Sequence, residues 1–175
     1  MKEFLIVVDM QKDFVDGALG TAEAVAIVPA VARKIKGFSG EIFITLDTHS
    51  EDYMNTLEGE NLPVPHCIKG TEGWQPDKSV AEALENKQHT VVEKITFGAT
   101  NLPALIEKAA AGEDFKIEIL GLCTDICVVS NALILKAAFP EKSIAVHRNM
   151  CAGVTPESHE AALLTMKMCQ IEIID

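Results

Sequence analysis

Short apolar segments alternate along this chain with longer segments of helical periodicity, and this alternation restricts the fold more than any other property of the sequence. Six segments have the length and apolar content of buried strands: residues 4–8, 42–46, 90–93, 117–120, 143–147 and 171–174. Helices are predicted between them, at residues 23–36, 80–84, 102–111, 131–139 and 156–168. Such an alternation folds through right-handed crossovers, so we predict one α/β domain over residues 1–175, a parallel sheet with helices on both faces.

Charge, apolar runs and cysteine usage exclude several kinds of partner and location. The formal net charge is −11 at pH 7, whereas nucleic acids and anionic membranes both require basic patches. No apolar run reaches transmembrane length, and no signal peptide precedes the first predicted strand. The five cysteines include no C-x-x-C pair, which is typical of a reducing compartment rather than of a disulfide framework. We therefore expect a cytoplasmic protein that binds neither nucleic acid nor membrane.

Polar residues follow four of the predicted strands. Asp9, Asp47, Lys94 and Cys127 each come just after the end of a different strand. Parallel strands end at the same edge of a sheet, and ligands of such sheets bind beyond that edge. The pattern therefore predicts a site that contains two carboxylates, an ammonium group and a thiol.

Cys127 is the candidate nucleophile of this site. The preceding strand is closed by Gly121, and Thr124 and Asp125 are good helix caps, so we expect the thiol in the first turn of a helix. The positive end of the helix dipole should lower the pKa of the thiol below the value of about 8.5 for free cysteine. Taken alone, however, a cysteine at a strand–helix junction is more often a packing residue.

Asp9 and Lys94 could complete the chemistry. Asp9 could accept the thiol proton and return it to a leaving group, while Lys94 would keep Asp9 ionised and favour the thiolate. Each also has an ordinary alternative role, since an acid after a strand often caps a turn and most lysines are solvated. None of the five histidines is an evident partner for Cys127.

A second group of residues has the composition of a metal site. Asp47-x-His49 is followed by His66, with Glu58 between them as an optional further ligand. An aspartate with two neutral imidazoles suits zinc, iron or manganese and leaves positions open for water or substrate. Residues 48–77 form a long irregular segment with three of the seven prolines, and loops of this length are usually functional. Histidines in loops are nevertheless mostly solvated, so the pattern alone is weak.

In these and neighbouring residues the chain resembles the isochorismatase-like cysteine hydrolases, and within them the nicotinamidases. The similarity extends in order over nearly the whole chain. It is carried by residues 8–14 (Val-Asp-Met-Gln-Lys-Asp-Phe), 47–49 (Asp-Thr-His), 65–71 (Pro-His-Cys-Ile-Lys-Gly-Thr), Lys94 with Phe97, and 121–128 (Gly-Leu-Cys-Thr-Asp-Ile-Cys-Val).

The resemblance implies a fold and a catalytic group. The fold is a three-layer α/β structure with a six-stranded, mostly parallel sheet. The catalytic triad consists of Asp9, Lys94 and Cys127. A cis peptide bond at Leu122–Cys123 is also implied, which directs the amides of Cys123 and Cys127 toward an oxyanion.

The resemblance further implies one divalent metal ion, with zinc favoured over iron or manganese. The metal ligands of nicotinamidases correspond to Asp47, His49 and His66, and members with an added glutamate match at Glu58. Isochorismatases proper lack this set. Its presence here favours the nicotinamidase subgroup.

The expected substrate follows from the subgroup, with one departure from its pattern. Nicotinamidases often carry an aromatic residue three positions before the second metal histidine, where this chain has Pro63. Phe14 and Phe97 are therefore the candidates for contacts with a substrate ring, with Trp74 as a third. We expect a homo-oligomer that hydrolyses nicotinamide, and pyrazinamide, through a thioester on Cys127. The alternatives are a hydrolase for another small amide or carbamoyl compound, and a non-catalytic metal- or ligand-binding relative.

Overall fold

The computed structural model describes all residues from Met1 to Asp175 and contains one sheet of six parallel strands. The strands are β1 (Lys2–Val8), β2 (Glu41–Asp47), β3 (His89–Lys94), β4 (Phe115–Leu122), β5 (Ser143–Ala152) and β6 (Glu172–Ile174). Their order, β3-β2-β1-β4-β5-β6, runs outward in both directions from the central pair β1 and β4. The predicted parallel sheet is confirmed, and the reversal of order places a ligand crevice at the carboxyl ends of β1 and β4.

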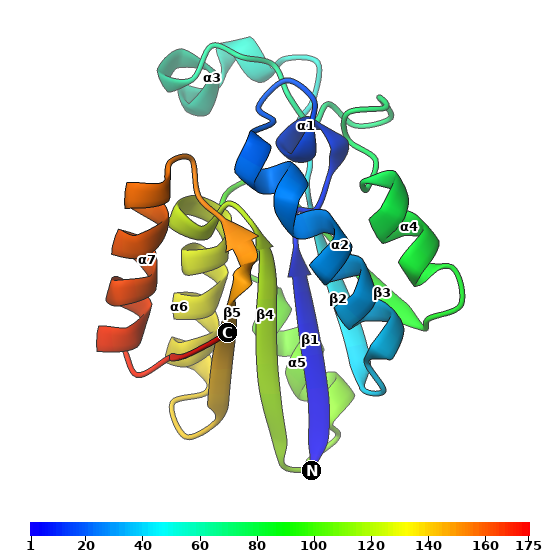
Figure 1. Cartoon of the computed structure of the whole chain (residues 1–175), viewed down its shortest axis with the longest axis vertical. Helices are drawn as coiled ribbons and strands as arrows, with labels where there is room; N and C mark the ends of the chain where they lie inside the picture. The colour runs from blue at the N-terminus through cyan, green and yellow to red at the C-terminus, as the bar shows by residue number, and fades with distance from the viewer.

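Helices cover both faces of this sheet. In Figure 1, α2 (Ala22–Gly37) crosses in front of the strands and α5 (Leu102–Ala110) lies behind them. The other helices are α1 (Lys12–Val15), α3 (Leu57–Asn61), α4 (Lys78–Leu84), α6 (Val129–Ala138) and α7 (Pro156–Met168), with the single turns η1 (Tyr53–Asn55) and η2 (Thr124–Val128). None of them combines the length and the apolar character that a membrane crossing requires.

The central strands are buried because their apolar runs face helices on both sides. The five residues from Phe4 to Val8 of β1 are each at most 1% exposed, which explains why this run is continuous rather than alternating. Helix α2 turns Ile27, Val31 and Ile35 into the core at helical spacing. Full burial of such a side chain contributes about 1.5–3 kcal/mol. The sheet is therefore a rigid platform for the residues at its edge.

Among the differences from the prediction away from the central strand, two bear on the site. The segment of residues 48–77 is not wholly irregular, because η1 and α3 lie within it. Strand β5 continues five residues beyond the predicted end, to Ala152. A register shift between Ile119 and Gly121 of β4 accommodates this extension. The extension brings the end of β5 beside the end of β4, at the predicted site.

The strand–helix junction after β4 also differs from the prediction. Helix α6 begins at Val129, two residues earlier than expected, and the wider turn η2 precedes it. In this turn the N–H of Val128 donates to the carbonyl of Cys123, five residues earlier, at 3.0 Å. Single wide turns of this kind occur frequently at functional sites.

Candidate active site

Four polar side chains meet at the carboxyl edge of the sheet. Asp9 follows β1, Cys127 lies in η2 beyond β4, and Asp47 and Lys94 are register partners at the ends of β2 and β3. None of the four is more than 5% exposed. The structure thus brings the predicted triad together with the first predicted metal ligand.

Lys94 connects the members of the triad. Its Nζ lies 2.6 Å from Asp9 Oδ2 and 3.6 Å from Cys127 Sγ, and it donates a hydrogen bond to the carbonyl of Thr96 at 3.0 Å. The other carboxylate oxygen of Asp9 accepts a 2.6 Å hydrogen bond from Thr45 Oγ1. Apart from the ion pair with Lys94, Asp9 Oδ2 has no partner. This oxygen is therefore free to accept a proton from the thiol.

Burial decides where the protons lie before any substrate arrives. It raises the pKa of Cys127 well above the usual value, and the charge of Asp9 adds to this effect while Lys94 opposes it. Burial likewise raises the pKa of Asp9 against the influence of Lys94. The prediction of a lowered thiol pKa is therefore wrong for the resting protein, because lost solvation and the charge of Asp9 outweigh the charge of Lys94. Asp9 becomes a better proton acceptor for the same reason.

Two backbone amides beside the thiol are candidates for an oxyanion site. The Leu122–Cys123 peptide bond is cis, and the N–H of Cys123 donates to no protein acceptor. Gly121 allows β4 to approach β1 closely at this point: its φ is +124°, and a Cβ there would lie 2.1 Å from the carbonyl oxygen of Val8. The role of the Cys123 and Cys127 amides stays a prediction.

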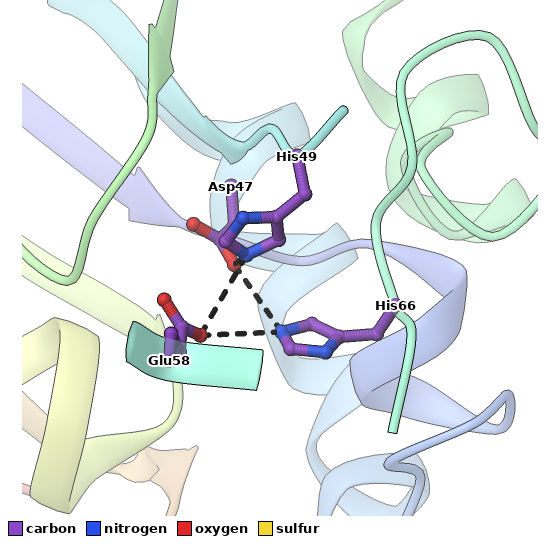
Figure 2. A group of neighbouring side chains, drawn as sticks. All are labelled: Asp47, His49, Glu58 and His66. Carbon is purple, nitrogen blue, oxygen red and sulfur yellow. Dashed lines mark hydrogen bonds and ion pairs between the residues drawn. The ribbon is translucent and has the colours of Figure 1, made fainter. Parts of the chain in front are cut away.

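The four predicted metal ligands point toward one another (Figure 2). One ligand atom of each of Asp47, His49, Glu58 and His66 lies within 4.8 Å of the others. His49 Nε2 lies 2.9 Å from Asp47 Oδ2, and Glu58 Oε1 lies 3.6 Å from His49 Nε2 and 3.7 Å from His66 Nε2. His66 Nδ1 donates to the carbonyl of Val64 at 2.8 Å, which leaves Nε2 to face the other ligands. Two imidazoles and two carboxylates at this spacing fit a divalent ion such as zinc.

The charges within this group are balanced by hydrogen bonds. Burial by itself would raise the pKa of Asp47 and lower that of His66. Hydrogen bonding between Asp47 and the histidines outweighs burial, so the pKa of Asp47 is lowered and that of His66 is raised. Asp47 is therefore ionised at neutral pH. Burial raises the pKa of Glu58 against the influence of His49 and His66. A bound cation would supply a counter-charge for the two acids.

Gln11 and Asp13 support the metal-ligand group, a role that their motif did not reveal in the sequence. The fully buried side chain of Gln11 donates to the carbonyl of Asp47 and accepts from its N–H, both at 2.8 Å. Asp13 accepts a 2.8 Å hydrogen bond from the N–H of Cys67, the neighbour of His66. The only signal in the sequence is a polar side chain soon after a buried strand, which does not identify its partners.

One cavity of about 230 Å³ reaches the thiol of the triad and part of the metal-ligand group, while Asp9, Lys94 and His49 do not line it. Cys123 and Cys127 line it, as do Asp47, Glu58 and His66, and most of its other lining residues are apolar. Pockets for drug-sized ligands typically measure about 300–1,000 Å³. This cavity therefore suits a small ligand that reaches the thiol and the metal-ligand group together.

The aromatic candidates for substrate contacts divide into two kinds. Phe14 and Phe97 both line the cavity, and the ring of Phe14 lies 5.4 Å from that of His66. Trp74 lies outside it and donates from its indole nitrogen to Thr48 Oγ1 at 2.9 Å. This side chain therefore holds the loop after β2, and its contact with substrate stays a prediction.

Comparison with known proteins relates this geometry to a family. The family model of the isochorismatase domain matches residues 3–175. The isochorismatase family protein PncA of Bacillus subtilis (strain 168) is 31% identical over 176 residues, which cover 93% of each chain. The crystal structure of nicotinamidase/pyrazinamidase PncA from Bacillus subtilis has a TM-score of 0.87 and 26% identity over 100% of both chains. The pyrazinamidase of Pyrococcus horikoshii in complex with zinc has a TM-score of 0.83 and 28% identity, over 100% of this chain and 99% of that one.

Proposed function

The chain belongs to the isochorismatase family, and we propose that it is a metal-dependent amidohydrolase that converts nicotinamide to nicotinate and ammonia. The observation that carries this proposal is the single small cavity lined both by the Cys127 thiol and by three of the four candidate metal ligands. A one-ring amide can reach both groups at once. Similarity to a nicotinamidase/pyrazinamidase and to a zinc-bound pyrazinamidase supports the same substrate class.

The candidate metal ligands would position the substrate. Asp47, His49, Glu58 and His66 would hold a divalent ion, zinc in the first instance. When bound, the ion would supply a Lewis acid for the ring nitrogen of nicotinamide. Phe14 and Phe97 would contact the ring from the apolar part of the cavity.

The acylation step follows from the proton positions in the site. Cys127 Sγ attacks the carboxamide carbon while Asp9 Oδ2 accepts the thiol proton, so no free thiolate has to form beforehand. The amides of Cys123 and Cys127 would stabilise the oxyanion, and each such donor is worth about 3 kcal/mol. Asp9 then delivers its proton to the amide nitrogen as the C–N bond breaks. Ammonia leaves, and the acyl group stays on sulfur as a thioester.

The second step reverses the role of Asp9. The carboxylate takes a proton from a water molecule that attacks the thioester carbon, and the C–S bond breaks. Asp9 returns this proton to the sulfur, and the acid leaves as nicotinate after it loses its remaining proton to solvent. Lys94 keeps its own proton throughout: burial alone would lower its pKa, but the charges of Asp9 and Asp47 raise it.

Ammonia release from an amide panel tests this proposal. We would assay the metal-loaded protein with nicotinamide, pyrazinamide, benzamide and an N-carbamoyl amino acid. Benzamide is the matched control, because it has the same carboxamide but no ring nitrogen. We expect kcat/KM for nicotinamide to exceed that for benzamide by at least about 10²-fold, since a site built to bind a polar atom discriminates strongly against an analogue that lacks it.

Other outcomes would favour the two rival functions. Faster turnover of the carbamoyl compound than of nicotinamide would indicate a hydrolase for a different substrate class. The absence of ammonia release from every amide by the metal-loaded protein would indicate a non-catalytic relative. Equal kcat/KM for nicotinamide and benzamide would remove the proposed role of the ring nitrogen.

A further inference from the structure

We propose that His159 is a positioning residue that fixes the oxyanion turn, residues 123–127, through the hydroxyl group of Thr124. The inference rests on the proposed function, because it assigns a purpose to the backbone of that turn. His159 is the fourth residue of α7 (Pro156–Met168), far along the chain from the triad.

The contact between Thr124 and His159 is short and buried on the threonine side. Thr124 Oγ1 lies 2.7 Å from His159 Nδ1, and Thr124 is 0% exposed. The hydroxyl group has no other hydrogen-bond partner. Thr124 directly follows Cys123 and lies three residues before Cys127, so it sits between the two proposed oxyanion donors. A shift of this side chain would move the N–H groups on either side of it.

A second pair of contacts ties the same turn to the same part of the chain. The carboxylate of Asp125 accepts from the N–H of Val154 at 3.1 and 3.2 Å. Gly153, which lines the cavity, packs directly on α7, where an added Cβ would lie 2.9 Å from the backbone nitrogen of His159. Two adjacent residues of the turn, Thr124 and Asp125, are therefore both held by the segment of residues 153–159.

His159 can act only through Thr124. It does not line the cavity, so it would not touch the substrate. Burial lowers the pKa of His159 below its usual value, and a neutral imidazole has one nitrogen that can accept the hydroxyl proton. The side chain is 14% exposed, but its replacement leaves the buried hydroxyl of Thr124 unpaired, so the contact must also be removed from the threonine side.

Four variants separate positioning from general stability. Thr124→Val and His159→Leu remove the hydrogen bond from either end. His159→Asn places an amide near the position of Nδ1 and should restore it. Thr165→Val is the matched control on α7, because the hydroxyl of Thr165 bonds only to the carbonyl of Ala161 in its own helix.

The first readout is hydrolysis of nicotinamide. We expect Thr124→Val and His159→Leu each to lower kcat by about 10- to 100-fold with KM within about twofold, since small displacements of a catalytic group cost rates of this order. The double variant should lose no more than the worse single one, because both changes break one contact. His159→Asn and Thr165→Val should retain most of the wild-type kcat.

The second readout does not depend on amide hydrolysis. Pyridine-3-carbaldehyde adds reversibly to a thiol: the C–S bond forms, the thiol proton moves to the carbonyl oxygen, and that oxygen occupies the proposed oxyanion position. We expect the dissociation constant of this adduct to rise by about tenfold or more in Thr124→Val and His159→Leu, and to stay near wild type in His159→Asn.

The outcomes distinguish the two proposals. A wild-type protein that binds the aldehyde at Cys127 but hydrolyses no nicotinamide would refute the proposed substrate, and the aldehyde series would still decide the role of His159. Losses in Thr124→Val and His159→Leu that multiply in the double variant would overturn the positioning role. So would folded single variants with kcat and aldehyde affinity within about twofold of wild type.

Discussion

The ammonium group of Lys94 lies 3.1 Å from Oδ1 of Asp47, while it also lies 2.6 Å from Oδ2 of Asp9. One buried cation therefore neutralises both the proposed general base and the first proposed metal ligand. Buried carboxylates are costly without a partner. The charge of Lys94 thus links the nucleophile and the metal-ligand group in one electrostatic unit.

Removal of this cation should affect activity and stability together. We expect Lys94→Met to lower kcat by at least about 10²-fold and the free energy of unfolding by about 3–5 kcal/mol, because two buried carboxylates lose their counter-charge. Lys69→Met is the control: Lys69 pairs with Glu93 at the surface, and loss of an exposed pair costs at most about 1 kcal/mol. Ammonia release and urea unfolding measure both effects. A Lys94→Met protein that matches Lys69→Met in both would show that Lys94 only fills space.

Asp9 should affect turnover and thiol ionisation in opposite directions. Burial and the charge of Asp9 raise the pKa of Cys127, so alkylation by iodoacetamide should be slow at neutral pH and accelerate as pH rises, because only the thiolate reacts. Asp9→Asn removes the negative charge but keeps Lys94. The pKa of Cys127 should then fall and the alkylation profile should move to lower pH, while kcat falls by about 10²–10⁴-fold.

The pH profile of alkylation can also contradict this account of Asp9. A profile that moves to higher pH in Asp9→Asn would mean that Asp9 promotes the thiolate in the resting protein. Unchanged alkylation together with unchanged kcat would reduce Asp9 to a turn residue.

The metal-ligand group should affect substrate binding but not the reactivity of the Cys127 thiol. His66→Ala, or removal of metal by a chelator, should lower kcat/KM for nicotinamide by at least about 10²-fold, while the alkylation rate of Cys127 stays near wild type. His89→Ala is the control, since His89 lies at the start of β3, outside the metal-ligand group. Metal content by elemental analysis should fall in His66→Ala alone. Full activity without bound metal would remove the metal from the mechanism.

The division among the aromatic side chains can be tested by one pair of substitutions. Phe14→Leu should raise KM for nicotinamide by about 2- to 10-fold, because an aromatic contact is worth about 0.5–1.5 kcal/mol. Trp74→Phe should leave KM within about twofold. It should lower the free energy of unfolding by about 1 kcal/mol, through loss of the hydrogen bond to Thr48. A larger KM effect at Trp74 than at Phe14 would place Trp74 back in contact with substrate.

Much of this site could be predicted from the sequence, because parallel strands end at a common edge. That rule brings Asp9, Asp47, Lys94 and Cys127 together without any knowledge of strand order. The order itself, with β1 beside β4, depends on tertiary packing that no local pattern encodes. Membership of the family and the fold are confirmed, whereas the homo-oligomeric state and the cytoplasmic location stay predictions.

The errors of sequence reasoning have a common physical origin. Sequence alone predicts a lowered pKa for Cys127, whereas burial raises it, because the depth of burial is a property of the folded chain. The hydrogen bond between Trp74 and Thr48 could not be predicted, because no local pattern shows which way the indole turns. Gln11 remained without a role because its partner, Asp47, is distant in the chain. In each case the missing information is a long-range contact.

The central claim is that Cys127 supplies the attacking sulfur, while Cys123 contributes only its backbone N–H. The most direct test is ammonia release from nicotinamide by metal-loaded Cys127→Ala and Cys123→Ala. We predict no turnover by Cys127→Ala, with metal content and fold unchanged, and a mild loss in Cys123→Ala. Retention by Cys127→Ala of even about a tenth of the wild-type kcat, a barrier difference of only about 1.4 kcal/mol, would contradict the claim.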